Sequence, residues 1–171
     1  ISFPFRCLSV VLMGRYPYLS RWGGYSSEDK EAALQAMEDT GTIHLAPRLI
    51  TEVSGGEAQR IIIARALAQQ SDLLFMDEAT SNLDISHAIR LLGLAARKVR
   101  DESKTVLSVF QDINQAAAYC DHLIFMARGK IAAHGDTRKV LSPETLRTVF
   151  EVDAKVYHDD YSNSLHVVYK R

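Results

Sequence analysis

The chain has 171 residues, which is enough for one domain with a sizeable buried core. Hydrophobic residues make up 47% of the chain and charged residues 24%, a balance typical of folded globular proteins. A formal net charge of -1 excludes a strong overall attraction to nucleic acid or anionic lipid, and no apolar run approaches the ~18 residues of a membrane-spanning helix.

The cysteines and histidines show no pattern of a disulfide framework or a metal site. Cys7 and Cys120 are the only cysteines and lie far apart in the sequence, outside any C-x-x-C pattern, so we expect two reduced thiols. The 6 histidines have no metal-ligand spacing, and we expect structural or surface roles for them.

The first third of the chain is predicted to form helices joined by turns. Leu8–Gly14 is apolar and has the composition of a short helix, and Tyr16–Tyr25 is rich in turn residues. Ser26 or Ser27 then caps a helix whose apolar residues recur at helical spacing until it ends near Gly41.

Helices and strands alternate in the middle of the chain. Glu57–Ala68 and His87–Val99 have the length and composition of helices. Leu73–Met76 and Thr105–Phe110 are apolar or β-branched runs, which indicates strands buried on both faces, as in a parallel sheet. This alternation predicts an α/β core.

The last third continues the same pattern. Asn114–Cys120 is predicted to be a short helix, and Leu123–Met126 a strand that turns back into Ile131–His134. Ser142-Pro143 opens another helix, since Ser is a good cap and Pro suits the first helical position. The tail, residues 153–171, alternates weakly and is expected to form edge strands or a loose end.

Two glycines stand before a predicted helix. Gly55 and Gly56 let backbone N–H groups approach a ligand without interference from a Cβ atom. The helix that follows directs its positive end to the same place, so the segment favours an anion, with phosphate as the expected ligand. Taken alone, such a glycine pair is often only a turn.

Two acids, Asp77 and Glu78, directly follow the strand Leu73–Met76. In a nucleotide site, the first acid at such a strand end can hold Mg²⁺, and the second can orient and deprotonate the attacking water. Taken alone, the pair would more often be solvated residues at a strand end. The glycine segment just upstream favours the nucleotide site.

Three segments together resemble the motifs of ABC transporter ATPases. Ser54–Arg60 resembles the signature motif, Leu73–Glu78 resembles Walker B with its adjacent glutamate, and Ser81–Asp84 resembles the D-loop. The resemblance covers the chain from Phe5 to about Val156. The sequence is most similar to those of ATPases that import iron-siderophores, haem or cobalamin.

The resemblance implies an α/β fold in which a partial P-loop NTPase (RecA-like) core carries the ABC helical subdomain. The helical subdomain would occupy residues 1–52 and dock on the membrane subunits. The partial ATPase core would occupy residues 53–152, and residues 153–171 would form a C-terminal tail.

The resemblance also implies roles for single residues. In the family, two ATPase domains pair head to tail, and each ATP lies between the P-loop of one protomer and the signature motif of the other. ATP and Mg²⁺ are therefore the expected cofactors, with Asp77 at the metal and Glu78 and Gln111 in catalytic positions. The residues expected to bind the nucleotide are Ser54, Gly55, Gly56, Glu57, Gln59 and Asp84.

Two departures from the family pattern lower the expected activity. Nothing fits G-x-x-x-x-G-K-[ST], the P-loop that binds the phosphates, so we expect that motif upstream of Ile1 and no ATP hydrolysis by this chain alone. Gln111 stands where the family has a His that contacts the γ-phosphate. Because Gln cannot become cationic or shuttle a proton, we expect weakened turnover.

The resulting hypothesis is an ATP-binding subunit, or a fragment of one, that couples ATP hydrolysis to import of an iron complex or related cofactor. Its expected partners are transmembrane permease subunits and a second ATPase subunit, at the cytoplasmic face of the inner (plasma) membrane, with no nucleic acid. Two alternatives stay open. One is a non-catalytic module that lends its signature motif to a complete partner. The other is half of a chromosome-maintenance or DNA-repair ABC ATPase, although the long heptad segments that would favour it are not visible.

Overall fold

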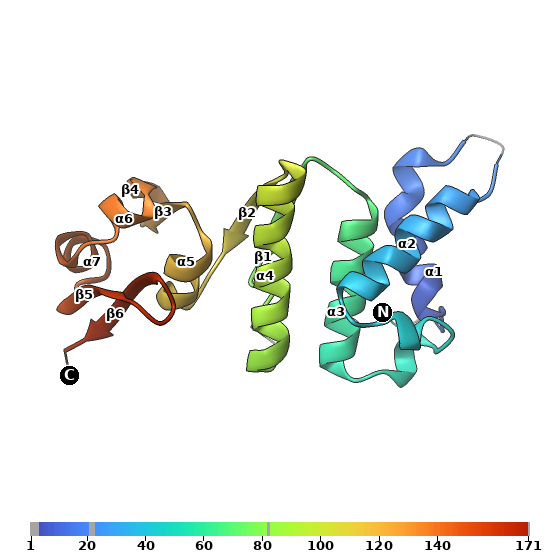
Figure 1. Ribbon diagram of the computed structural model, residues 1–171, viewed down its shortest axis with the longest axis horizontal. Coiled ribbons are helices and arrows are strands. Elements are labelled where there is room, and N and C mark those ends of the chain that lie inside the picture. The colour runs from blue at the N-terminus through green and yellow to red at the C-terminus, as the bar shows by residue number, and fades with distance from the viewer. Residues whose placement is uncertain (1–3, 21–22, 82, 171) are drawn as a thin grey trace. The chain divides into compact units, whose positions relative to one another are not determined.

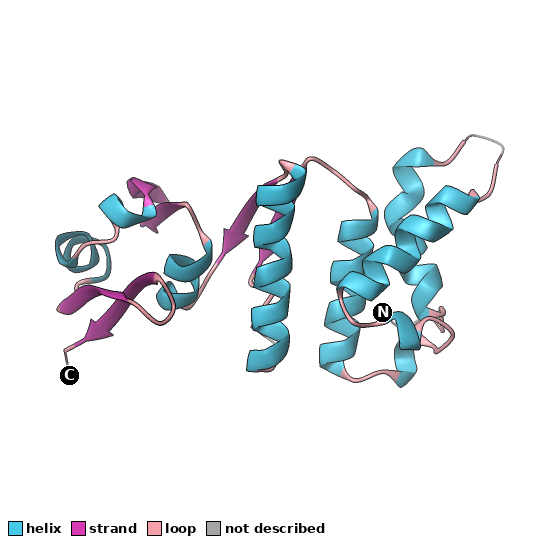
Figure 2. Ribbon diagram, in the orientation of Figure 1, coloured by secondary structure: helices cyan, strands magenta, loops and turns pink. Residues whose placement is uncertain are grey.

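The computed structural model describes residues 4–20, 23–81 and 83–170. It divides into two compact units, of which the first ends at Val109 and the second begins at Phe110. Figures 1 and 2 show helices and one strand pair in the first unit, and short helices with hairpins in the second. None of the described helices is long and apolar enough to cross a membrane.

The first unit is helical at its start and alternates between strand and helix at its end. Its elements, in chain order, are α1 (Cys7–Leu12), the 3₁₀ helix η1 (Met13–Tyr18), α2 (Ser27–Asp39), the 3₁₀ helices η2 (Ile43–Leu45) and η3 (Ile50–Glu52), α3 (Gly55–Ala68), β1 (Leu73–Asp77), α4 (Ile85–Glu102) and β2 (Thr105–Val109).

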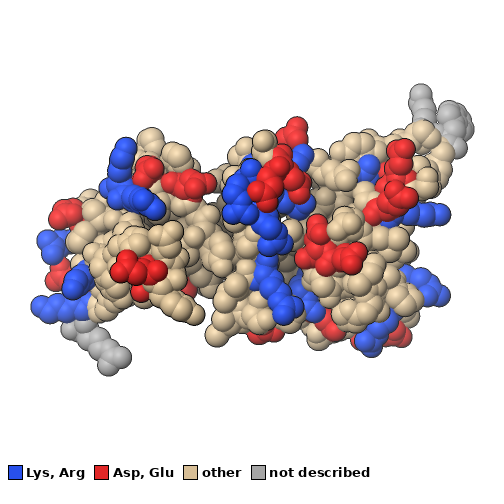
Figure 3. All heavy atoms as spheres, viewed as in Figure 1, with Lys and Arg blue, Asp and Glu red and all other residues tan. Residues whose placement is uncertain are grey.

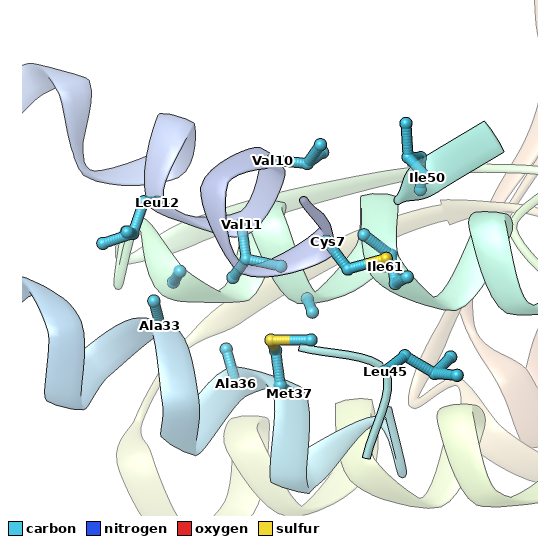
Figure 4. Packing of buried hydrophobic residues seen from close by; sticks show 12 residues of the cluster. Cys7, Val10, Val11, Leu12, Ala33, Ala36, Met37, Leu45, Ile50 and Ile61 are labelled. Atoms are coloured by element: carbon cyan, nitrogen blue, oxygen red, sulfur yellow. The ribbon is translucent and has the colours of Figure 1, made fainter. Parts of the chain in front are cut away.

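The helices α1, α2 and α3 enclose one apolar cluster. Met37 of α2, Leu45 of η2 and Ile61 of α3 are its largest fully buried side chains. Figure 4 shows the side chains of this cluster gathered between the helices that carry them. The packing is close: a Cβ atom on Gly14 would lie 2.1 Å from the carbonyl oxygen of Arg65, so only glycine fits where η1 meets α3.

A buried arginine ties these helices together. The Nε of Arg15 donates to Asp29 Oδ1 at 2.8 Å, and its Nη1 donates to the carbonyl oxygen of Ala68 and to Gln70 Oε1, both at 2.9 Å. Asp29 also accepts from the backbone N–H of Ser26 at 2.9 Å, in a reciprocal cap that confirms Ser26 as the start of α2. These hydrogen bonds, above all the one from Arg15, lower the pKa of Asp29.

The strands β1 and β2 pair in parallel, with Leu73 opposite Thr105 and Asp77 opposite Val109. One face of the pair packs against α3 and α4 around the buried side chains of Met76 and Leu91. We predicted burial on both faces, and this was wrong for the described residues, because helices cover only one face. The other face exposes four large apolar side chains: Leu73, Phe75, Leu107 and Val109.

The second unit consists of helices packed with two hairpins. Its elements are α5 (Ile113–Tyr119), β3 (His122–Ala127), β4 (Lys130–Asp136), α6 (Thr137–Val140), α7 (Pro143–Phe150), β5 (Ala154–Asp159) and β6 (Ser164–Tyr169). β3 pairs with β4 and β5 with β6, both antiparallel. The tail therefore forms a hairpin, the first of the two predicted alternatives.

The start of α7 lies where the sequence predicted it. Ser142 caps α7 and Pro143 occupies its first turn. Arg128 and Gly129 both have positive φ, 51° and 72°, and form the two-residue turn between β3 and β4. Leu146 of α7 is fully buried in the apolar cluster of this unit.

Candidate functional site

The N-terminus of α3 is closed by a reciprocal cap. Ser54 Oγ accepts from the backbone N–H of Glu57 at 3.3 Å, while Glu57 Oε2 accepts from the backbone N–H and the hydroxyl of Ser54 at 2.8 and 2.9 Å. These hydrogen bonds, led by the one from the Ser54 backbone, lower the pKa of Glu57. The carboxylate of Glu57 is therefore held against Ser54 in its ionised form.

The sequence predicted that the two glycines stand before the helix. In the structure they lie inside the first turn of α3. Among the described residues, none accepts a hydrogen bond from the backbone N–H groups of Gly55 and Gly56. A Cβ atom on Gly55 would meet nothing within 4 Å. Packing within this chain thus does not require glycine there, and the helix start is open to an anion from outside.

The remaining signature residues continue along α3. Gln59 and Arg60 lie half-buried in the second turn of the helix. Arg60 is half-buried as a residue, but its Nε is fully buried and has no hydrogen-bond partner among the described residues. We had not singled out this side chain from the sequence, and no local signal there indicates a buried donor without an acceptor.

The two acids lie where the sequence predicted, at the end of β1. Asp77 is the last residue of the strand and Glu78 follows it, and both side chains are exposed. Glu78 has a φ of 46°, a conformation uncommon for residues other than glycine and one that recurs at functional sites. They lie at the carboxyl end of a parallel strand pair, the edge at which α/β sheets bind ligands.

Chain direction brings the two sets of residues toward the same end of the first unit. α3 leads away from its Gly55 end, and β1 runs back to finish at Asp77 (Figure 1). The open helix start and the two acids therefore face the same end of the fold.

Asp84 also has a structural role, which was not predicted from the sequence. It caps α4: its Oδ1 accepts from the backbone N–H of His87 at 3.0 Å, and its Oδ2 lies 2.6 Å from His87 Nδ1. The backbone hydrogen bond from His87, followed by the side-chain one, lowers the pKa of Asp84. Asp is a preferred cap residue, and its place just before the predicted helix is the signal that could have revealed this role. Asn82 of the same segment lies outside the described residues.

Gln111 belongs to the second unit. It is exposed and stands between β2 and α5, just before Asp112, whose side chain caps α5. Asp77 and Glu78 belong to the first unit.

The residues present fit a shared magnesium ion and a phosphate. Within the described part of the chain, no group of three or more His, Cys, Asp or Glu residues could hold a metal alone. Magnesium commonly takes one or two protein carboxylates and completes its shell with phosphate oxygens and water. Asp77 as a single ligand is compatible with that arrangement, and the unused N–H groups of α3 suit a phosphate.

Residues 8–81 match the sequence family described as ABC transporter. The cobalamin import ATP-binding protein BtuD of Halobacterium salinarum is 38% identical over 167 residues, 98% of this chain and 42% of BtuD. The iron(3+)-hydroxamate import ATP-binding protein FhuC of Bacillus subtilis is 36% identical over 154 residues, 90% of this chain and 57% of FhuC. The chain thus spans about half the length of these curated relatives.

Solved structures of the same kind superpose on the chain. A transporter in an inward-facing conformation, provisionally assigned to the metal-chelate type of ABC transporter, matches 100% of this chain and 68% of its own with a TM-score of 0.88 and 29% identity. The dimeric structure of a bacterial ABC transporter cassette matches 80% of this chain and 59% of its own, with a TM-score of 0.69 and 27% identity. These matches confirm the predicted fold class.

Proposed function

Since this chain belongs to the family of ABC transporter ATP-binding proteins, we propose that it serves as the ATP-binding subunit of an importer and couples ATP hydrolysis to uptake of an iron complex or a related cofactor. The observation that carries the proposal is likeness over 98% and 90% of the chain to relatives named for cobalamin import and for iron(3+)-hydroxamate import.

The start of α3 is the proposed phosphate contact. The N–H groups of Gly55 and Gly56, together with the hydroxyl of Ser54, bind the γ-phosphate of an ATP held mainly by a second ATPase subunit. Support comes from the unused donors at this helix start and the free space at Gly55. A relative of the same fold was solved as a dimer. Gln59, Glu57 and Asp84 flank this contact.

The acids at the end of β1 are the proposed catalytic pair. Asp77 holds Mg²⁺, which when bound neutralises negative charge on the phosphates. Glu78 orients the attacking water and accepts its proton. Support comes from their place at the carboxyl edge of the parallel strands and from the unusual backbone of Glu78.

The remaining assignments concern the assembly. Residues 1–52 dock on transmembrane permease subunits, residues 53–152 form the ATPase core, and residues 153–171 form a C-terminal tail. The subunit then sits peripherally at the cytoplasmic face of the inner membrane. The names of the relatives, as ATP-binding proteins of import systems, support the association with a membrane transporter.

Two capping serines provide the test. Ser54 caps α3 and Ser142 caps α7, each accepting from the backbone N–H three residues on. Replacing either by Ala should cost about 1 kcal/mol of stability. In the complete gene product assembled with its permease, only Ser54→Ala should also lower ATP turnover, by roughly 10²-fold. Equal turnover for the two variants would mean that Ser54 is only a cap, and the proposal would fail.

Gln111 favours a second candidate, a non-catalytic module that lends its signature motif to a complete partner. The amide cannot replace a histidine in carrying charge or a proton. Glu78→Gln separates the two candidates. For a catalytic subunit, this variant should lower turnover of the assembled complex by roughly 10²-fold or more. If Glu78→Gln is silent while Ser54→Ala is not, the module hypothesis is correct.

A further inference from the structure

A small cavity lies in the first unit, and none of the residues proposed to contact the nucleotide lines it. It has a volume of about 280 Å³ and is bounded by the C-terminal end of α2, the second and third turns of α3 and one face of α4. Most of the charged groups that line it are basic. Arg60 comes from α3 and His87, Arg90 and Arg97 come from α4.

The helical repeat explains how α4 supplies three of these side chains. Positions three and seven residues apart lie on the same side of a helix, so His87, Arg90 and Arg97 form one stripe. Leu91 and Leu94, buried beside the stripe, fix this face of the helix against the unit. Figure 3 shows basic side chains gathered along α4.

The guanidinium groups that line the cavity make no short polar contact within the part of the chain that the structure describes. Among the described residues, those of Arg60, Arg90 and Arg97 form no ion pair and no side-chain hydrogen bond. Other cations of α4 behave differently. Lys98 lies 3.0 Å from Glu102 Oε1, and Arg100 lies 2.9 Å from Asp101 Oδ1. Arg90 and Arg97 are therefore the cavity-lining cations of α4 that form no ion pair among the described residues, whereas His87 is paired with Asp84.

The side chain of Arg60 independently indicates that the cavity binds a ligand. Its Nε is buried and lacks an acceptor among the described residues, although the residue lines the cavity. Buried donors in folded proteins almost always have a partner, and a charged donor loses most when it has none. The missing acceptor points to a group that enters from outside the chain.

Two carboxylates also line the cavity, and one is already engaged. Asp39 accepts from Gln35 Nε2 at 3.0 Å and lies 3.8 Å from Lys98 Nζ. Glu38 lines the same cavity as the guanidinium groups of Arg60, Arg90 and Arg97, which outnumber the two carboxylates. The lining is thus positive on balance and suits an anion.

We propose that this cavity binds a phosphate-type oxyanion, either free phosphate or the headgroup of an anionic phospholipid. Guanidinium groups match such an ion because their planar N–H forks donate in pairs to its oxygens. A volume near the lower limit of ligand pockets suits one such group and not a whole nucleotide. The inference does not depend on the proposed function.

Inorganic phosphate is the probe for the test. It is titrated into the ¹⁵N-labelled full chain while the side-chain Nε–H signals of its arginines are followed one by one. The signals of Arg60, Arg90 and Arg97 should shift and saturate together, and that of Arg100 should not. Because the signals are read residue by residue, phosphate bound at the start of α3 cannot imitate this result.

Charge-matched variants complete the test. Arg90 and Arg97 are exposed, so the double variant Arg90→Gln/Arg97→Gln should fold normally, as circular dichroism will check. It should bind phosphate roughly tenfold more weakly or worse, whereas Arg100→Gln on the same helix should bind as the parent does. Arg60→Lys, which keeps the charge but loses the fork, should also weaken binding. An equal loss in Arg100→Gln would overturn the proposal.

A second arm distinguishes the sources of the phosphate. The chain is sedimented with vesicles that contain an anionic phospholipid and with vesicles of phosphatidylcholine alone. Sedimentation with the anionic vesicles that disappears in the double variant identifies a headgroup. A saturating phosphate titration without vesicle binding identifies a free anion. If neither phosphate nor vesicles shift the three arginine signals, the proposal is wrong.

Discussion

Helix caps occupy positions at which the family is expected to contact nucleotide. Ser54 and Glu57 cap α3, and Asp84 caps α4. The capping hydrogen bonds lower the pKa of both carboxyl groups, so both are ionised near neutral pH. The carboxylate of Glu57 accepts from the backbone N–H of the cap residue Ser54, and that of Asp84 accepts from the N–H of His87 at the third helical position. The N–H groups of Gly55 and Gly56 remain able to bind an anion from outside the chain. The first turn of α3 can therefore be stabilised by its cap and still bind a ligand.

Gln111 is the residue at which we expect activity to be limited. In the complete gene product assembled with its permease, Gln111→His should raise ATP turnover by roughly 10²-fold, about 3 kcal/mol of barrier, because an imidazole can carry charge next to the γ-phosphate. Turnover at saturating ATP is the measurement. Gln69→His, at the exposed end of α3, is the control. Equal turnover for the parent and the Gln111→His variant would show that the amide donates a hydrogen bond as well as the imidazole does.

The pair of Arg15 and Asp29 predicts how stability depends on pH. The folded pKa of Asp29 is below its ordinary value, so the stability that it contributes is present above about pH 4 and is lost as the pH falls through the lower folded pKa. Asp29→Asn should therefore lower the urea midpoint at neutral pH, and the difference from the parent should shrink below about pH 4.

Asp101→Asn is the matched control for that measurement. Asp101 also pairs with an arginine, Arg100, but both side chains are exposed, and exposed ion pairs contribute little. Its urea midpoint should stay close to that of the parent at every pH. A constant gap for Asp29→Asn down to about pH 3 would contradict the ion-pair account.

At the scale of elements, α2 is held by its buried face. Met37 is fully buried among α1, α2 and α3, whereas Leu34, on the same helix, is 38% exposed. Met37→Ala should lower the free energy of unfolding by about 2–5 kcal/mol, since it removes packed atoms and leaves a cavity. Leu34→Ala should change it by about 0.5 kcal/mol or less. Denaturant unfolding followed by circular dichroism distinguishes them, and similar losses would place the core elsewhere.

The bounds of α4 illustrate what ends a helix. The apolar spacing predicted His87–Val99, whereas the helix runs from Ile85 to Glu102. It begins earlier because Asp84 caps it, and it ends at Ser103, which is in the left-handed conformation with a φ of 55°. Periodicity marks the buried face, and the caps set the length.

At the scale of the whole molecule, the open face of β1 and β2 is the feature with the largest consequence. Phe75 is 67% exposed and Leu107 opposite it is 47% exposed, on two strands that pair only with each other among the described residues. Apolar faces and unpaired strand edges of this kind promote association. We expect the 171-residue chain to oligomerise in solution, as sedimentation velocity over a concentration series will measure.

Substitutions on that face test the cause of association. Phe75→Thr with Leu107→Thr keeps strand-forming side chains while removing apolar surface, and should shift the chain toward monomer. Ile89→Gln on α4 removes another exposed apolar side chain, 54% exposed, away from the strands, and should leave association unchanged. A parent chain that is already a monodisperse monomer would contradict the prediction.

The sequence by itself determined the elements and the order of the motifs. Ser26, Ser142 and Pro143 predicted helix starts because capping chemistry is local, and the apolar runs predicted β1 and β2 because short apolar and β-branched runs favour strands. The signature, Walker B and D-loop motifs indicated the fold class, because each is a short contiguous sequence associated with one backbone arrangement.

Only the tertiary structure decided which surfaces those elements cover. A continuous apolar run is the same string whether one face of a strand or both are packed, so the open face holding Phe75 was invisible in the sequence. The cavity around Arg60 was equally invisible, because its arginines come from two helices separated in the chain and meet only when α3 packs beside α4. Burial and partnership depend on what arrives from elsewhere in the fold, and local pattern carries no record of that.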